Sequence, residues 1–147
     1  MDIDEVQAAV APLLAAKGAS RAVLFGSVAR GTDDGRSDVD LIVVDDSDLP
    51  YFARLDKYYD EMVETLRRPL DLFVYREAEF EKMRERSFLR RALAEGKVIR
   101  LEAFRRARAR SRRRAAPLAR HRARAARARP ERPPAARVSR QGAGPQG

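Results

Sequence analysis

Two aspartates open an apolar run in the first third of the chain, and this combination restricts the folds available to it. Residues 38–44 read Asp-Val-Asp-Leu-Ile-Val-Val, which is rich in β-branched residues and has the length of a strand. Side chains two residues apart share a strand face, so Asp38 and Asp40 are expected to point the same way. Neighbouring carboxylates repel each other and resist desolvation unless a proton or cation lies between them. A hard divalent cation such as Mg²⁺ suits this pair.

A tight turn is predicted just upstream of the two aspartates. Residues 21–25 read as a buried strand, and residues 26–31, Gly-Ser-Val-Ala-Arg-Gly, read as a short helix closed by glycine. Gly26 lets the backbone approach a ligand closely, and Ser27 adds a hydroxyl beside free N–H groups. The turn therefore predicts a phosphate-binding site. Arg30 could either reach that phosphate or pair with a neighbouring acid, and the sequence leaves both roles open.

A third acid lies in a later apolar run. Residues 68–75 read Arg-Pro-Leu-Asp-Leu-Phe-Val-Tyr, a further strand pattern, and Asp71 is the sole charge inside its apolar run. If the strand lies beside the one that carries Asp40, Asp71 completes a carboxylate trio. It would then bridge a metal ion or accept the proton of an attacking hydroxyl.

These motifs together resemble the minimal nucleotidyltransferases of the polymerase-β superfamily. The resemblance rests on Gly26-Ser27, ten intervening residues, Asp38-x-Asp40, and Asp71 within Leu-Asp-Leu, and it covers roughly residues 1–100. It implies an α/β (α+β) fold with a small mixed β-sheet flanked by helices. It also implies that Asp38, Asp40 and Asp71 are catalytic and hold two Mg²⁺ ions, while Gly26 and Ser27, with Arg30 as a further candidate, hold the triphosphate of ATP.

The resemblance also implies a partner. Many members of this family are antitoxins that add AMP to a tyrosine of a small helical HEPN ribonuclease toxin. The predicted function is therefore Mg²⁺-dependent protein adenylylation that silences such a toxin. Two alternatives stay open: a noncatalytic module that masks a partner toxin or holds RNA, and a nucleotidyltransferase that acts on a small molecule.

The charge of the chain divides sharply near residue 100. Residues 101–147 contain 15 arginines against Glu102 and Glu131, so this segment carries 15 − 2 = +13, whereas residues 1–100 carry 16 − 20 = −4. The sequence predicts a catalytic domain over 1–100 and a basic, low-complexity tail over 101–147 that is disordered or marginally helical, with any helix ending before Pro117. Such a tail could contact RNA or DNA phosphates nonspecifically. It could equally be an extension without function, or the product of read-through or a frame shift.

Further expectations concern the acidic domain and its surroundings. A helix is predicted between the second and third strands, with Phe52, Tyr58 and Tyr59 packing in the core, and the acidic trio is placed on an open sheet face. Loop aspartates are expected to be solvated solubilisers: Asp33, Asp34, Asp45, Asp46 and Asp48. The sequence has no cysteine and no apolar run long enough to span a membrane, so a soluble, cytoplasmic protein is expected.

Overall fold

Helices and strands alternate along the part of the chain that the structure describes. In this computed structural model the backbone is described for residues 1–126 and the side chains for residues 1–115. The elements, in order, are α1 (Ile3–Lys17), β1 (Arg21–Phe25), α2 (Gly26–Arg30), β2 (Val39–Val44), α3 (Tyr51–Leu66), β3 (Leu70–Tyr75), α4 (Glu77–Met83), α5 (Ser87–Glu95), β4 (Lys97–Val98) and α6 (Glu102–Ala126).

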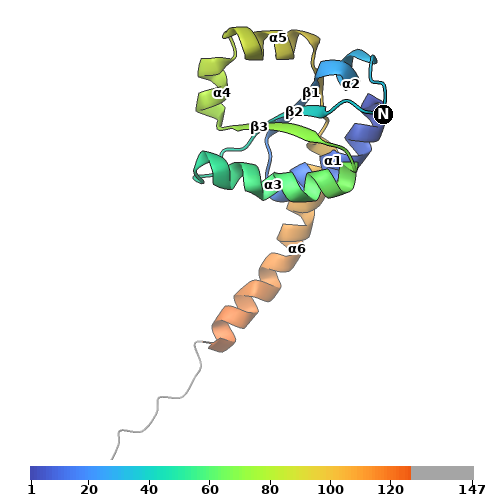
Figure 1. The fold of residues 1–147 in the computed structure, drawn as a ribbon. Coiled ribbons are helices and arrows are strands. Elements are labelled where there is room, and N and C mark those ends of the chain that lie inside the picture. The colour runs from blue at the N-terminus through green and yellow to red at the C-terminus, as the bar shows by residue number, and fades with distance from the viewer. Residues whose placement is uncertain (127–147) are drawn as a thin grey trace, which may run out of the picture. The chain divides into compact units, whose positions relative to one another are not determined.

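The four strands form one mixed sheet in the order β3-β2-β1-β4. Figure 1 shows β3, β2 and β1 of this sheet with the helices around them. β1 runs antiparallel to both β2 and β4, whereas β2 and β3 are parallel. Parallel neighbours need a crossover connection, and α3 supplies it. The predicted small mixed sheet flanked by helices is confirmed.

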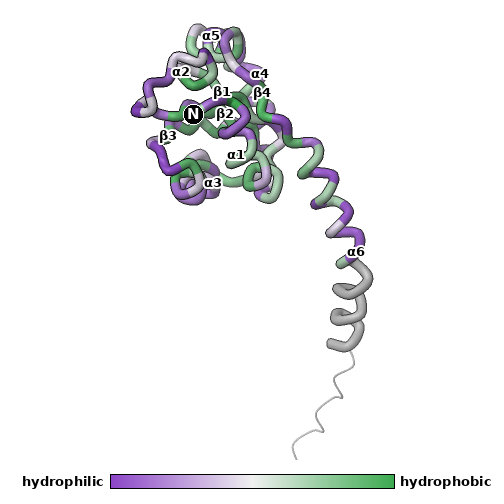
Figure 2. The backbone as a smooth tube through the Cα atoms, turned by 90° about the vertical axis from the view of Figure 1, so that its right-hand side faces the viewer, coloured by the Kyte–Doolittle hydropathy of each residue, from purple (hydrophilic) through white to green (hydrophobic). Residues whose placement is uncertain are grey.

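Helices cover both faces of this sheet. On one face, α1 and α3 pack against alternate strand residues such as Leu24, Leu41 and Leu72 in the larger apolar core. On the other face, α4 and α5 contribute Phe80 and Leu89 to a smaller core. This core packs against the strand residues that alternate with the first set and point to the opposite face of the sheet. Hydrophobic residues accordingly concentrate in the strands (Figure 2). The expectation of an open sheet face is wrong, because α4 and α5 cover its apolar part.

The buried side of α3 differs from the predicted one. Phe52 is 75% exposed and Tyr59 is 38% exposed, whereas Tyr58 is fully buried. The buried stripe follows a spacing of four residues: Arg54, Tyr58, Met62 and Leu66. The prediction therefore holds for Tyr58 and is wrong for Phe52 and Tyr59. Arg54 belongs to the buried stripe although it is charged. Its burial is possible because its guanidinium forms an ion pair at 2.9 Å with a residue of α4.

The basic segment begins as a helix attached to the domain. Contacts divide the chain into Met1–Arg112 and Arg113–Gly147. Within the first unit Leu101 is buried, and Arg108 Nη1 donates to the Ala15 carbonyl at 3.0 Å. The domain boundary at residue 100 stays a prediction.

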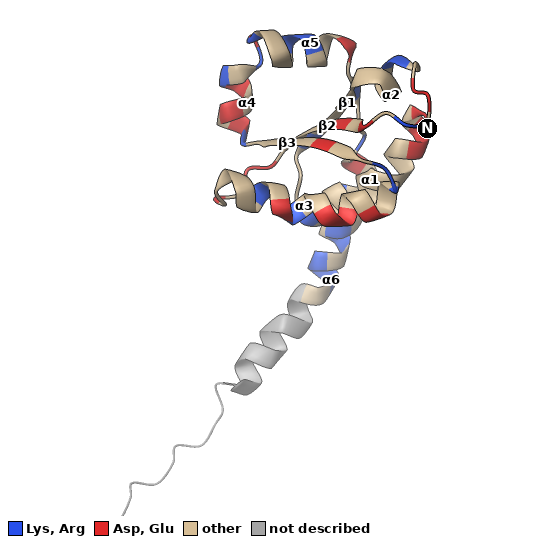
Figure 3. Ribbon diagram, in the orientation of Figure 1, with Lys and Arg blue, Asp and Glu red and all other residues tan. Residues whose placement is uncertain are grey.

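α6 itself continues through Pro117 to Ala126, past the predicted end of the helix. Proline removes one backbone donor, while arginine and alanine on both sides favour helix. The described part of α6 is rich in arginine (Figure 3). Residues 127–147 of the predicted tail lie outside the described part of the chain. Over residues 1–126, no helix combines the length and apolar character that crossing a membrane requires.

Candidate functional site

The strands bring two of the three predicted acids together. Asp40 on β2 and Asp71 on β3 are partners in the parallel ladder, so their side chains leave the same sheet face on neighbouring strands. Asp38 lies immediately before β2. Asp38 and Asp71 are exposed, and Asp40 is half-buried. The acids therefore line the beginning of the parallel pair of strands, with Asp40 innermost.

The predicted phosphate turn meets this acidic corner. Phe25, the last residue of β1, pairs with Asp40, so Gly26 follows directly beside that carboxylate. Gly26 has a φ of 71°, and a Cβ atom built there would overlap the carboxylate of Asp40. Only glycine fits this position without a rearrangement. The turn and the acid pair thus form one continuous site.

Arg30 pairs with an acid that the sequence did not single out. Its Nη1 lies 3.0 Å from both carboxylate oxygens of Glu95, the last residue of α5. The same carboxylate accepts a hydrogen bond from the backbone N–H of Gly26 at 3.3 Å. Of the two roles left open for Arg30, pairing with an acid is the one present in this structure.

The electrostatics of the corner centre on Asp40. Burial raises the pKa of its carboxyl group, and the negative charges of Asp71 and Asp38 raise that pKa further. Arg30 acts in the opposite direction, and Glu95 adds to the increase. Ionised Asp40 is therefore electrostatically strained, and a bound cation would relieve that strain.

The donor set suits a hard divalent cation, because carboxylates supply oxygen ligands only. Among the residues with described side chains, however, no group of three or more acidic or histidine residues is gathered closely enough to hold a metal ion. The assignment of Asp38, Asp40 and Asp71 as metal ligands therefore stays a prediction.

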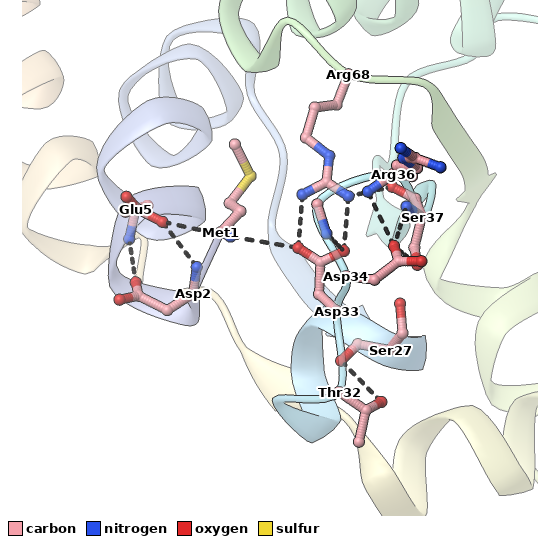
Figure 4. Close-up of polar contacts among 11 residues, drawn as sticks. Met1, Asp2, Glu5, Ser27, Thr32, Asp33, Asp34, Arg36, Ser37 and Arg68 are labelled. Atoms are coloured by element: carbon pink, nitrogen blue, oxygen red, sulfur yellow. Dashed lines mark hydrogen bonds and ion pairs between the residues drawn. The ribbon is translucent and has the colours of Figure 1, made fainter.

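The loop between α2 and β2 is fixed by a buried ion pair (Figure 4). Arg68 donates to both oxygens of Asp33, at 2.6 and 2.7 Å, and to the carbonyl of Ser37. The terminal amine of Met1 lies 3.2 Å from the same Asp33 carboxylate. The Arg68 guanidinium holds the pKa of Asp33 well below its usual range. The expectation that Asp33 is a solvated loop residue is wrong, since its side chain is only 3% exposed.

The neighbouring Asp34 has a local role. Its carboxylate accepts hydrogen bonds from the backbone N–H groups of Arg36 and Ser37 and from the Ser37 hydroxyl. These bonds shape the turn that leads into Asp38. Ser37 is therefore part of this turn.

Asp45, at the far end of β2, is the other loop aspartate whose expected exposure is wrong. It is 2% exposed and accepts hydrogen bonds from Lys57 Nζ at 2.7 Å and the Tyr58 hydroxyl at 2.8 Å. The backbone N–H of Ser47 donates to it as well. Burial alone would raise the pKa of Asp45, but these donors together outweigh burial and lower it. Asp45 therefore ties β2 to α3, whereas Asp46 and Asp48 are exposed as predicted.

Glu95 and Arg68 are the residues at this site that the motifs did not reveal. Each acts through a partner distant in sequence, 65 residues away for Glu95 with Arg30 and 35 for Arg68 with Asp33. The available signals were weak: Glu95 precedes a glycine at a helix end, and Arg68 precedes the proline before β3.

Comparison with known families gives one direct match. The model of the nucleotidyltransferase domain family matches residues 13–99, which include the turn and all three acids. No curated protein matches the chain significantly.

Several solved structures are similar. A toxin–antitoxin crystallised with AMP-PNP is 21% identical, with 75% of this chain and 90% of that chain covered and a TM-score of 0.49. A mutant of the MntA-HpeT toxin–antitoxin is 19% identical, with 75% and 90% covered and a TM-score of 0.48. A tri-AMPylated HEPN toxin of Shewanella oneidensis in complex with its MNT antitoxin is 18% identical, with 77% and 89% covered and a TM-score of 0.45.

Proposed function

Because this chain belongs to the nucleotidyltransferase domain family, we propose that it transfers AMP from ATP to a hydroxyl group of a protein. The observation that carries the proposal is the closeness of Gly26 to Asp40, which leaves no room for a Cβ atom between turn and carboxylate. A phosphate bound at the turn would lie beside carboxylates able to hold a cation. Nucleotidyl transfer needs this combination.

Each group in the corner has a proposed task. Asp38, Asp40 and Asp71 would hold two Mg²⁺ ions, and Gly26, Ser27 and Arg30 would bind the triphosphate. When bound, Mg²⁺ neutralises phosphate charge and orients the reacting oxygens. The chain's own groups would position the nucleotide, and Asp71 would accept the proton of an incoming hydroxyl; its exposure on β3 supports this role.

The reaction balances without a further reagent. The acceptor oxygen forms a bond to the α-phosphorus of ATP, the bond from that phosphorus to the bridging oxygen breaks, and pyrophosphate leaves. The hydroxyl proton passes to the carboxylate that acts as base. The products are an AMP ester of the acceptor and pyrophosphate.

We propose a tyrosine of a HEPN-type toxin as the acceptor, with this chain as its antitoxin. The motif resemblance supports this choice. The exposure of Asp38 and Asp71 is consistent with it, since an exposed corner can receive a side chain from another protein. A cytoplasmic location stays a prediction.

The test is incubation of the full chain with ATP, Mg²⁺ and a candidate HEPN protein, followed by intact-mass measurement of the candidate. The expected result is a gain of one or more AMP units that disappears in the Asp38→Ala/Asp40→Ala variant. Asp46→Ala, which removes an exposed acid on a loop, is the control and should retain the gain. A mass gain that persists in the double variant would contradict the catalytic assignment.

Contact of the basic segment with RNA or DNA is a separate proposal, supported by its charge of 15 − 2 = +13 over residues 101–147. Arginines on the described part of α6 are exposed from Arg105 to Arg114, apart from the half-buried Arg108. Binding through phosphates should weaken steeply with salt and show little sequence preference. Fluorescence anisotropy with short RNA and DNA duplexes measures this affinity. An affinity that does not change with salt concentration would rule this proposal out.

A further inference from the structure

A carboxylate of the chain itself occupies the donors of the proposed phosphate turn. The Glu95 side chain accepts from the Gly26 backbone N–H at 3.3 Å and from Arg30 Nη1 at 3.0 Å to each oxygen. Its side chain is 28% exposed, so the contact lies at the surface of the corner and is open to exchange with a dissolved ligand. Backbone N–H groups and guanidinium groups are the donors that phosphate oxygens use, and a carboxylate competes for them directly.

The position of Glu95 is set by the packing of the residue that follows it. A Cβ atom at Gly96 would lie 2.5 Å from Val23 Cγ1 and 2.7 Å from the Ala92 carbonyl oxygen. Gly96 therefore allows the end of α5 to lie against β1, with Ala92 and Leu89 buried in the smaller core. The Glu95 carboxylate is thereby held against the turn by a packed helix.

The charge balance of the corner depends on this residue. The negative charges of Asp71, Asp38 and Glu95 all act on Asp40, and the positive charge of Arg30 offsets them in part. An incoming triphosphate meets repulsion from Glu95 and also finds Arg30 engaged. Removing the Glu95 charge frees the guanidinium and reduces the repulsion together.

We propose that Glu95 is an internal competitor for the nucleotide: it occupies Gly26 and Arg30 in the nucleotide-free protein, and the triphosphate must displace it to bind. This inference rests on the proposed function, since it concerns the same turn. It makes Glu95 a determinant of nucleotide affinity, and it predicts that α5 loses its tether to the turn when the nucleotide binds.

The test is calorimetric binding of ATP with Mg²⁺, and separately of inorganic tripolyphosphate, to the full chain. Glu95→Gln keeps the shape of the side chain and removes its charge, so it should tighten binding of both ligands about tenfold. Glu64→Gln removes an exposed charge from α3 and should leave both affinities unchanged. When Glu95→Gln is combined with Arg30→Ala, it should tighten binding by less, because no guanidinium is present for the substitution to free. Thermal unfolding of each variant checks that the fold is retained.

Two results would overturn the inference, and they separate it from the proposed function. Weaker or unchanged binding in Glu95→Gln, with wild-type binding intact, would show that Glu95 only positions Arg30, and the proposed function would stand. Failure of the wild type and of all variants to bind either ligand would contradict both.

Discussion

Asp40 and Asp71 lie directly opposite each other in the parallel ladder of β2 and β3. Neighbouring strands are about 4.8 Å apart, so their carboxylates leave one sheet face side by side. Gly26 directly follows β1, the other neighbour of β2, and lies against Asp40. Three segments distant in sequence therefore converge at one corner.

Gly26→Ala should impair both stability and nucleotide binding. A left-handed backbone costs a residue with a Cβ atom about 1–2 kcal/mol, and at Gly26 the new atom also displaces the Asp40 carboxylate. Gly31→Ala is a matched control, because Gly31 has a φ of 73° and no neighbouring atom lies within 4 Å of the added Cβ. Chemical denaturation should show the larger loss for Gly26→Ala. Equal losses would mean that the overlap with Asp40 has no energetic consequence.

Asp40→Asn should stabilise the metal-free protein at neutral pH by about 1 kcal/mol, as substitutions at strained functional sites commonly do. The pKa of Asp40 is raised in the folded state, so its ionised form disfavours folding. The advantage of the variant should appear above the folded pKa and shrink as the pH falls through it, where the wild-type carboxyl is protonated. Thermal melts in chelator between pH 4 and 8 measure this. A variant less stable than wild type at pH 7 would contradict the account.

Asp45→Asn should weaken the fold at neutral pH by about 2 kcal/mol, because it removes a charge that Lys57 and Tyr58 bind at a buried position. The folded pKa of Asp45 is lowered, so its contribution is present above the unfolded value of about 3.9 and is lost as the pH falls through the folded value. The wild type should therefore lose its advantage over the variant in strong acid. Urea denaturation at pH 7 and pH 3 checks this, with Asp46→Asn as an exposed control. An equal deficit at both pH values would contradict the assignment.

Arg68→Lys should loosen the loop that carries Asp34 and Ser37 toward the site. Lysine cannot reproduce the forked contact of Arg68 with both oxygens of Asp33. Limited proteolysis should cut residues 32–37 faster in the variant, and the transfer rate should fall because Asp38 follows the loop directly. Arg67→Lys, an exposed neighbour, should behave as wild type. Unchanged protection of the loop would show that the ion pair does not order it.

The first three strands, the crossover helix and the short helix after Gly26 were predictable because each has a local pattern. The adjacency of Asp71 and Asp40 followed from a parallel sheet that the sequence could only assume. The sequence missed what depends on distant partners. Asp33 and Asp45 look like solvated loop acids until Arg68 and Lys57 are placed beside them.

The α3 face shows the same limit. Its hydrophobic pattern favours Phe52 as a core residue, but the helix buries Arg54 instead, because an ion pair across to Glu79 makes that burial possible. Periodicity reports where apolar residues recur and does not report which polar residue has found a partner.

Pyrophosphate release by Asp71→Asn tests the central claim most directly, because Asp71 enters the site only through the pairing of β3 with β2. With ATP, Mg²⁺ and a HEPN-type acceptor, the wild type should release pyrophosphate in step with AMP transfer, and Asp71→Asn should be at least about 100-fold slower. Pyrophosphate release by Asp71→Asn at the wild-type rate would contradict the assignment of this corner as the catalytic site.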